Sequence, residues 1–207
     1  MKNCYLLKLP TLSNELHQDL LKFGQSFIPA EGFDVIELQE LGKDTQIWVD
    51  FHNHTGTTRS SYIKFDLAED LQSRIKTEMT DELFLFSEVN FYMQLVVGGE
   101  KLIPHRDPGR TLSILYNISS DHAVTHFYRT HIHDADKYLY AIDETEEIEN
   151  HRMLPHKWYV FNNEAIHGVS QMFTKRLAIT CMLNADQKLN LPNYKTFCER
   201  YKQLLDF

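Results

Sequence analysis

The chain has 207 residues and a formal net charge of −8, with 43% hydrophobic and 24% charged residues. This composition is typical of one folded globular domain and excludes a disordered or low-complexity protein. An acidic chain lacks the basic surface that a phosphate backbone requires, so we expect no nucleic-acid partner. No stretch approaches the roughly 18 apolar residues of a membrane span, and the N-terminal apolar run is too short for a signal peptide. We therefore predict a cytoplasmic protein with no membrane partner.

Cysteine usage also favours a reducing compartment. Cys4, Cys181 and Cys198 are odd in number and widely spaced. This pattern fits free thiols better than a disulfide framework or a zinc knuckle. We assign the three thiols no chemistry.

The first ninety residues have a mixed α+β pattern. Residues 11–24 carry apolar side chains at helical spacing, with Ser13 as the expected N-cap and Gly24 as the expected stop. Residues 46–51 alternate as a strand does. This region is expected to pack on a core that follows it.

A second amphipathic helix is predicted over residues 65–79. Its apolar residues recur every four positions, which places them in one stripe. Asp66 and Glu69 have the spacing of a capping-box variant and would mark the helix start. We expect this helix to pack on a sheet.

From about residue 84 the pattern changes to short β-like runs separated by turns, as in an antiparallel sandwich or barrel. The charge run at residues 143–149 is expected to be a solvated loop or strand face. A closing helix is predicted over residues 191–207. The expected strands cover residues 83–99, 111–119, 123–130, 138–142, 157–163 and 176–183.

A metal site is suggested by the segment LIPHRDPGR. Side chains alternate across a strand, so His105 and Asp107 would point to the same side. Pro108-Gly109 would then turn the chain into the next strand. His167 follows on a second apolar run. Two histidines and one carboxylate can bind a metal as a facial triad, with three positions left open for other molecules.

The ordinary alternative is that these histidines are only hydrogen-bonded, because eleven histidines produce chance His-x-Asp pairs. Two other clusters, His52 with His54 and His131 with His133, have no partner in a strand-like context further along the chain. We interpret these four as solvated loop histidines.

Arg176 opens an apolar run nine residues after His167. Burial of a guanidinium is expensive without an anion, and a bidentate guanidinium suits a carboxylate. If it shares a face with Ala178 and Thr180, that face has room for a small dicarboxylate. The alternative is an exposed Arg176 paired with an acid such as Glu164.

These features occur in a fixed order along the chain. The run FYMQLVVGGEKLIPH leads to His-x-Asp, RTLSILYN follows, and FNNEAIHGV carries the distal histidine before Arg176. The pattern, over residues 90–185, resembles the 2-oxoglutarate/Fe(II)-dependent dioxygenase superfamily, in particular its prolyl-hydroxylase-like members. The resemblance implies a mainly β fold with a double-stranded β-helix (jelly-roll, cupin-like) core and flanking helices. The implied organisation is a single domain, 1–207, with a lead-in at 1–89, the core at 90–185 and a C-terminal helix at 190–207.

The resemblance also implies roles for individual residues. Iron would be held by the catalytic triad His105, Asp107 and His167, and the distal carboxylate of 2-oxoglutarate by Arg176. The residues that would assist the co-substrate or line the pocket are Tyr116, Tyr92 and Gln94. Tyr116 could equally be a core aromatic, and Arg110 could contact substrate or face solvent.

The implied activity is hydroxylation of a C–H bond with dioxygen, while 2-oxoglutarate is decarboxylated to succinate. An amino-acid or peptidyl side chain is the favoured substrate, with ascorbate as a possible reductant; oligomeric state stays open. One alternative is a cupin-type metal barrel, but the glutamate expected soon after Asp107 is absent. A nucleic-acid demethylase would carry a second arginine where Met182 stands. A metal-free binding module is the remaining alternative.

Overall fold

The computed structural model has a mainly β architecture. Two antiparallel sheets face one another, and the described residues include three α-helices. The β class and the flanking helices were predicted from sequence. The described residues are 1–26, 46–48, 61–97, 101–107, 109–119, 123–134, 137–170, 176–184 and 192–206.

The larger sheet, here called the major sheet, has eight strands. Their bounds are β1 Cys4–Leu7, β2 Gln46–Trp48, β3 Ser61–Asp66, β4 Tyr92–Val97, β6 Arg110–Asn117, β9 Trp158–Asn162, β11 Arg176–Asn184 and β12 Leu205–Asp206. They lie in the order β12-β1-β9-β6-β11-β4-β3-β2. The first ninety residues thus add strands at both ends of the sheet, β1 beside β9 and β3 beside β4.

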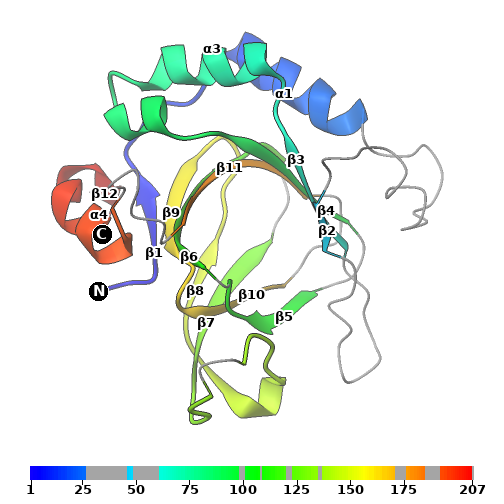
Figure 1. The fold of residues 1–207 in the computed structure, drawn as a ribbon, viewed down its shortest axis with the longest axis vertical. Helices are drawn as coiled ribbons and strands as arrows, with labels where there is room; N and C mark the ends of the chain where they lie inside the picture. Colours follow the sequence, from blue (N-terminus) through cyan, green and yellow to red (C-terminus); the bar gives the residue numbers. More distant parts are fainter. Residues whose placement is uncertain are drawn as a thin grey trace.

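The smaller sheet, here called the minor sheet, has four strands in the order β5-β10-β7-β8. Their bounds are β5 Lys101–His105, β7 Val124–Thr130, β8 Thr145–Arg152 and β10 Ile166–Ser170. Figure 1 shows the minor sheet below the major sheet, with the two ends of the chain close together at one side.

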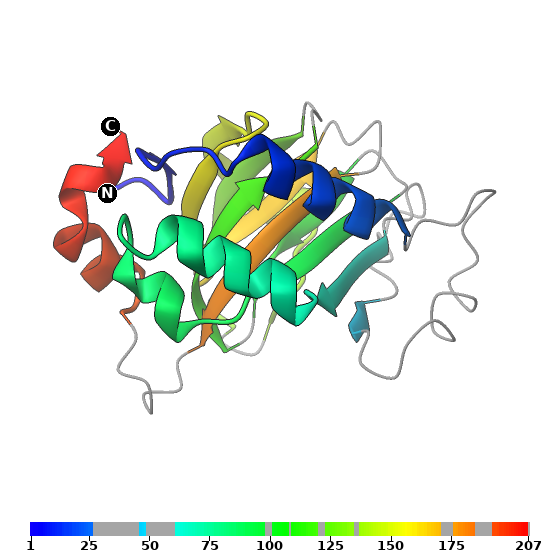
Figure 2. The same cartoon turned by 90° about the horizontal axis from the view of Figure 1, so that it is seen from above.

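Two helices cover the outer face of the major sheet. Helices α1 (Asn14–Ser26) and α3 (Glu69–Met79) both lie across its strands, as Figures 1 and 2 show. Each buries one stripe of side chains with near four-residue spacing, as expected for an amphipathic helix on a sheet. The buried apolar side chains are Leu16 and Leu20 of α1 and Leu71, Ile75 and Met79 of α3.

The start of α1 is as predicted, but its end is not. Ser13 is the N-cap, and its Oγ accepts a hydrogen bond from the Leu16 amide at 3.3 Å. Gly24 lies inside the helix and is buried. A Cβ at this position would lie 2.8 Å from Cδ2 of Leu177. Gly24 therefore permits a close approach between α1 and β11, and its assignment as a stop is wrong.

The predicted capping box at α3 is also wrong. Ala68 is the N-cap and makes no side-chain hydrogen bond, and Asp66 is the last residue of β3. The strand continues to Asp66 because it pairs with β4 over six residues. Sheet pairing has therefore overridden a local helix signal.

Two other segments differ from the predictions. Phe84–Glu88 forms a 3-10 helix rather than the start of a strand. The C-terminal helix α4 is limited to Tyr194–Arg200, capped by Asn193, because the chain then turns through the 3-10 helix Lys202–Leu204 to form β12 against β1.

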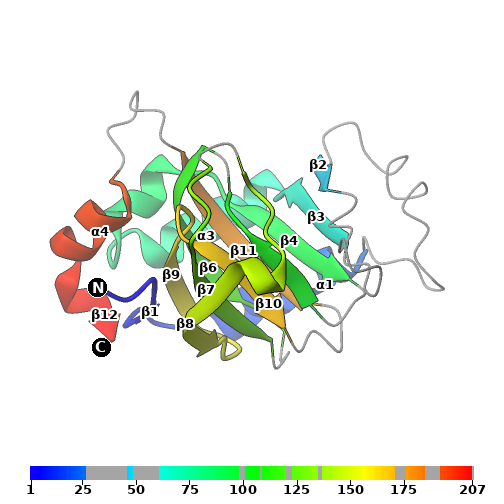
Figure 3. The ribbon, with the colours of Figure 1, turned by 90° about the horizontal axis from the view of Figure 1, so that it is seen from below.

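The connection between β7 and β8 follows the edge of β5 rather than forming the strand expected at residues 138–142. Leu139 makes only an isolated bridge with His105. The Tyr140 amide donates to the Pro104 carbonyl, and the Arg106 amide to the Tyr138 carbonyl, both at 2.9 Å. Figure 3 shows this connection in front of the minor sheet. The connection thus places residues 138–140 beside the C-terminal end of β5, where His105 stands.

Strand β8 is the edge of the minor sheet and carries the charge run predicted to be solvated. Most of its side chains are exposed. Its pairing with β7 shifts by one residue, because Phe127 pairs with Glu149 while Tyr128 pairs with Glu147. Ile148 is therefore the extra residue of a bulge, and its side chain is 50% exposed.

Two clusters of buried apolar side chains lie on opposite faces of the major sheet. The outer core lies between this sheet and the helices and includes Tyr116, Trp158 and Leu177. The second group, here called the inner cluster, lies between the two sheets. Its members are Cys4, Leu115, Phe127, Met153, Tyr159, Phe161 and Ala178.

All three cysteines are buried and free, as the sequence predicts. In the described part of the chain, no helix has the length and apolar character needed to cross a bilayer.

Candidate metal centre

Two histidines face each other on neighbouring strands of the minor sheet. His105 is the last residue of β5, and His167 is its direct partner in β10. Their ring centroids are 4.4 Å apart. The His167 ring also lies within 6.1 Å of the rings of Phe127 and Phe161. Because both phenylalanines belong to the inner cluster, His167 points into the space between the sheets.

Backbone carbonyls set the tautomer of both rings. Nδ1 of His105 donates to the Ile103 carbonyl at 2.8 Å, and Nδ1 of His167 donates to the Ala165 carbonyl at 3.0 Å. A carbonyl can only accept, so Nδ1 carries the proton in each ring and Nε2 carries the lone pair of the neutral form. Both histidines are thereby oriented as metal ligands usually are.

Asp107 lies just beyond the end of β5, two residues after His105. Its Oδ2 is 3.9 Å from Nε2 of His167. It accepts a short hydrogen bond from Nδ2 of Asn163 and lies 3.5 Å from Nη1 of Arg110. The ligand atoms of the two histidines and Asp107 all lie within 4.8 Å of one another. The structure thus brings the predicted triad together.

The electrostatics of the triad favour metal binding. Burial, together with the neighbouring His167, lowers the pKa of His105 to about 4, so this ring is neutral at neutral pH. Burial alone would raise the pKa of Asp107, but His167, His105, Arg110 and the Asn163 hydrogen bond together lower it. Two imidazoles and one carboxylate are a donor set that fits Fe(II) and other first-row metals. The residues present therefore fit the expected ion.

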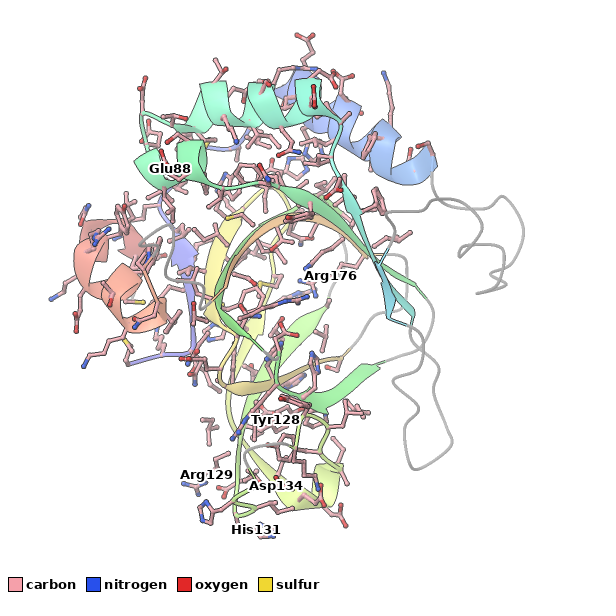
Figure 4. All side chains as sticks on the ribbon, in the orientation of Figure 1. Glu88, Tyr128, Arg129, His131, Asp134 and Arg176 are labelled. Atoms are coloured by element: carbon pink, nitrogen blue, oxygen red, sulfur yellow. The ribbon has the colours of Figure 1, made fainter. Side chains whose placement is uncertain are left out.

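Arg176 lies on the facing sheet and points toward the same interior space. Its neighbour Leu177 packs in the outer core while Ala178 packs in the inner cluster. Side chains alternate across a strand, so Arg176 and Ala178 share the inner face. Arg176 is 7% exposed, and Figure 4 shows it between the sheets. The alternative of an exposed Arg176 at a strand end is therefore wrong.

Tyr92 and Gln94 share this inner face. They pair in register with Thr180 and Ala178 of β11, and the intervening Met93 packs in the outer core. Both side chains are half-buried. The structure therefore places both on the same face of the major sheet as Arg176.

Tyr116 is not brought to the site. It lies in the outer core, where its ring packs 4.9 Å from Trp158 and its hydroxyl lies 3.4 Å from Nδ1 of His17. Its neighbours Leu115 and Asn117 lie on the other face of β6. The assignment of Tyr116 to the co-substrate is therefore wrong, because the major sheet lies between its side chain and the triad.

Arg110 is largely buried beside Asp107, with 14% of its side chain exposed. Of the two roles considered from sequence, the solvent-facing one is therefore wrong. Contact with substrate stays a prediction.

Two buried asparagines were missed by the sequence analysis. Asn163 holds Asp107, and Asn117 lies on the inner face beside Ala178. Both are 1% exposed. The sequence contained a signal for each asparagine. Asn163 directly follows the apolar strand WYVFN and stands in the turn before His167, and Asn117 is next to Tyr116 in a strand, so the two side chains point to opposite faces.

The remaining candidate histidines lie elsewhere. His131 and His133 are exposed loop residues, as predicted, and Figure 4 places His131 at the far tip of the molecule from Arg176. The pair His52 and His54 lies outside the described residues, as does Pro108 of the predicted turn. Within the described residues, the His105, Asp107 and His167 group is the only cluster of its kind.

Known structures resemble this arrangement. The non-heme alpha ketoglutarate dependent epimerase SnoN from nogalamycin biosynthesis superimposes with a TM-score of 0.51 and 12% identity, over 84% of this chain and 76% of that chain. A prolyl hydroxylase from Trichoplax adhaerens, solved with a hypoxia inducible factor oxygen degradation domain peptide fragment, gives a TM-score of 0.51 and 14% identity, over 92% and 87%. The chain has the fold of these two enzymes. At sequence level no family model matches, and no curated protein matches.

A second structure of SnoN has Fe3+, alpha ketoglutarate and nogalamycin RO bound, and it superimposes with a TM-score of 0.50 and 13% identity, over 84% and 76%. Likeness at this level of identity establishes the fold. The likeness in fold rests on the backbone, whereas the His-Asp-His group rests on side-chain positions, so the two observations are independent.

Proposed function

We propose that this protein is an Fe(II)- and 2-oxoglutarate-dependent dioxygenase of the prolyl-hydroxylase-like type. It hydroxylates a C–H bond of an amino-acid or peptidyl side chain and converts 2-oxoglutarate to succinate. The observation that carries this proposal is the proximity of the side chains of His105, Asp107 and His167, whose ligand atoms lie within 4.8 Å of one another. Under this proposal residues 90–185 form a double-stranded β-helix within a single domain.

Each triad residue has a defined task. His105 and His167 would present Nε2 to the metal, because their Nδ1 protons are held by carbonyls. Asp107 would add the negative charge. Bound Fe(II), together with 2-oxoglutarate and dioxygen, supplies the oxidising power to break a C–H bond. Phe127 and Phe161 beside His167 would exclude water from that side of the centre.

Arg176 would hold the distal carboxylate of 2-oxoglutarate. Its guanidinium is buried on the inner face of β11, where a bidentate contact with a carboxylate is strong. Tyr92 and Gln94 would line the same pocket from β4. The peptidyl substrate class is proposed by fold-level analogy with the prolyl hydroxylase solved with a peptide.

Binding of the co-substrate is the first test. Metal-free protein is titrated anaerobically with Fe(II) and 2-oxoglutarate, and a weak visible charge-transfer band is expected. Release of succinate is then screened against free amino acids and peptides. Asp107→Ala should abolish both signals, whereas His133→Ala, which removes an exposed loop histidine, should leave them unchanged.

Two results would contradict the proposal. The first is no charge-transfer band at saturating Fe(II) and 2-oxoglutarate with folded wild-type protein. The second is turnover of 2-oxoglutarate that persists in Asp107→Ala. A metal-dependent activity without 2-oxoglutarate would instead favour the cupin-type alternative.

A further inference from the structure

Asn163 lies in the turn between β9 and β10, four residues before His167. Its side chain is 1% exposed, and its Nδ2 donates a short hydrogen bond to Oδ2 of Asp107. An amide nitrogen can only donate and an ionised carboxylate can only accept. The contact therefore fixes both the orientation of the amide and the rotation of the carboxylate.

The amide orientation is set by this one contact. Among the described residues, Oδ1 of Asn163 has no hydrogen-bond partner. If the amide were reversed, Oδ1 would face an oxygen of Asp107, and two acceptors would repel each other. Within the described part of the chain, the hydrogen bond to Asp107 therefore determines which end of the amide faces the triad.

The backbone of this turn is bound to the triad independently of the side chain. The Asp107 amide donates to the Asn163 carbonyl at 3.4 Å, and the Asn163 amide donates to the Thr111 carbonyl at 3.3 Å. Replacement of the Asn163 side chain leaves both contacts available. The turn can therefore keep its place while the hydrogen bond to Asp107 is removed.

We propose that Asn163 is a positioning residue that orients the Asp107 carboxylate toward the two histidines and so sets the metal affinity of the centre. The inference rests on the proposed function only in requiring that the triad binds a metal. Loss of a residue that hydrogen-bonds a metal ligand usually weakens metal binding by about 10- to 100-fold. Nη1 of Arg110 lies 3.5 Å from the same oxygen, whereas Nδ2 of Asn163 makes the short hydrogen bond to it.

The test measures metal binding without co-substrate. Metal-free Asn163→Leu, which has a similar volume but no donor, is titrated with Co(II) by calorimetry and by its visible spectrum. We expect binding weaker by about 10- to 100-fold and an altered Co(II) spectrum. The matched control is Asn150→Ala, since Asn150 is exposed on β8 and its amide donates to Glu147 at 2.7 Å, away from the triad. Its affinity and spectrum should equal those of the wild type.

A second variant covers the case in which leucine prevents folding. Asn163→Ala removes the same donor without adding an apolar branch, and its unfolding transition is measured in parallel. Wild-type affinity and spectrum in whichever variant folds would overturn the inference. Wild-type protein that binds Co(II) but never consumes 2-oxoglutarate would contradict only the proposed function. Wild-type protein that binds no metal would contradict both.

Discussion

His105 and His167 are direct partners in the register between β5 and β10. Two ligands from distant parts of the sequence are therefore aligned by a single strand pairing. Because a strand alternates its faces, a slip of one residue would turn His167 away from the interior. The candidate metal centre thus depends on the strand pairing of the minor sheet as well as on the three side chains.

We expect Arg176→Met to weaken 2-oxoglutarate binding by about 10- to 100-fold, because charge-assisted hydrogen bonds to a buried carboxylate are worth roughly 1.5–3 kcal/mol. Binding of Co(II) alone should change little, since Arg176 lies on the other sheet. Isothermal calorimetry of the metal-loaded protein measures both.

The control for this prediction is Arg129→Met. Arg129 makes two hydrogen bonds with Glu146 on the surface, so its loss should leave 2-oxoglutarate affinity unchanged. Equal affinity of Arg176→Met and the wild type would contradict the assignment of Arg176.

The members of the triad could be predicted from sequence because each stands in a recognisable local pattern. His105 and Asp107 stand two residues apart, and His167 and Arg176 each belong to an apolar strand with a clear pattern. Tyr116 was misplaced because β6 is buried on both faces, so hydrophobic alternation gives no information on which way a side chain points. Asn163 was missed because its partner is set by the approach of two loops.

The fold was predictable to a similar degree. Amphipathic helices and most of the long strands have periodic patterns that sequence reveals. The short strands β1 and β12 do not, because each is formed by pairing with a remote segment. Gly24 resembled a helix stop for the same reason: only the packed structure shows that Leu177 occupies the space beside it.

Gly24→Ala should destabilise the protein by about 1 kcal/mol. Overpacking against Leu177 destabilises the folded protein by roughly 1–3 kcal/mol. The higher helix propensity of alanine offsets up to about 1 kcal/mol of this. In a Leu177→Ala background the clash is gone, so the same change should become stabilising. Urea unfolding of the four proteins measures this coupling, and Gln25→Ala, at an exposed helix position, is the neutral control. Identical effects in both backgrounds would show that α1 does not approach β11 this closely.

The metal-free protein should lose stability as the pH falls below 6.5. Burial, with a contribution from the stacked His156, lowers the pKa of His17 from its ordinary value of 6.5. His17 therefore has a higher pKa in the unfolded chain than in the folded protein, and the unfolded chain binds a proton at a higher pH. The loss of stability begins near pH 6.5 and continues until the pH reaches the pKa of His17 in the folded protein.

His17→Gln should remove part of this loss, at most about 1.4 kcal/mol between pH 7.5 and 5.5. Unfolding free energies at the two pH values provide the comparison, with His133→Gln as the exposed control. A pH dependence equal to that of the wild type would exclude His17 as a source.

The three thiols should resist modification in the folded protein. All are buried, and burial raises the pKa of Cys181 to about 12 and raises those of Cys4 and Cys198. The reactive thiolate is therefore rare at pH 8. Ellman's reagent should titrate three thiols only after unfolding, whereas Ser26→Cys, at an exposed position, should react at once. Rapid reaction of the wild type would contradict this burial.

The bulge at Ile148 affects the tendency of the protein to aggregate. A regular strand at the edge of a sheet offers a row of amides and carbonyls on which another chain can align, and this is a common route to aggregation. In β8 the extra residue breaks that row at its middle, and glutamates stand on either side of it. The exposed isoleucine therefore lies at the point of β8 where addition of another strand is least favourable. We expect this arrangement to reduce aggregation at high protein concentration.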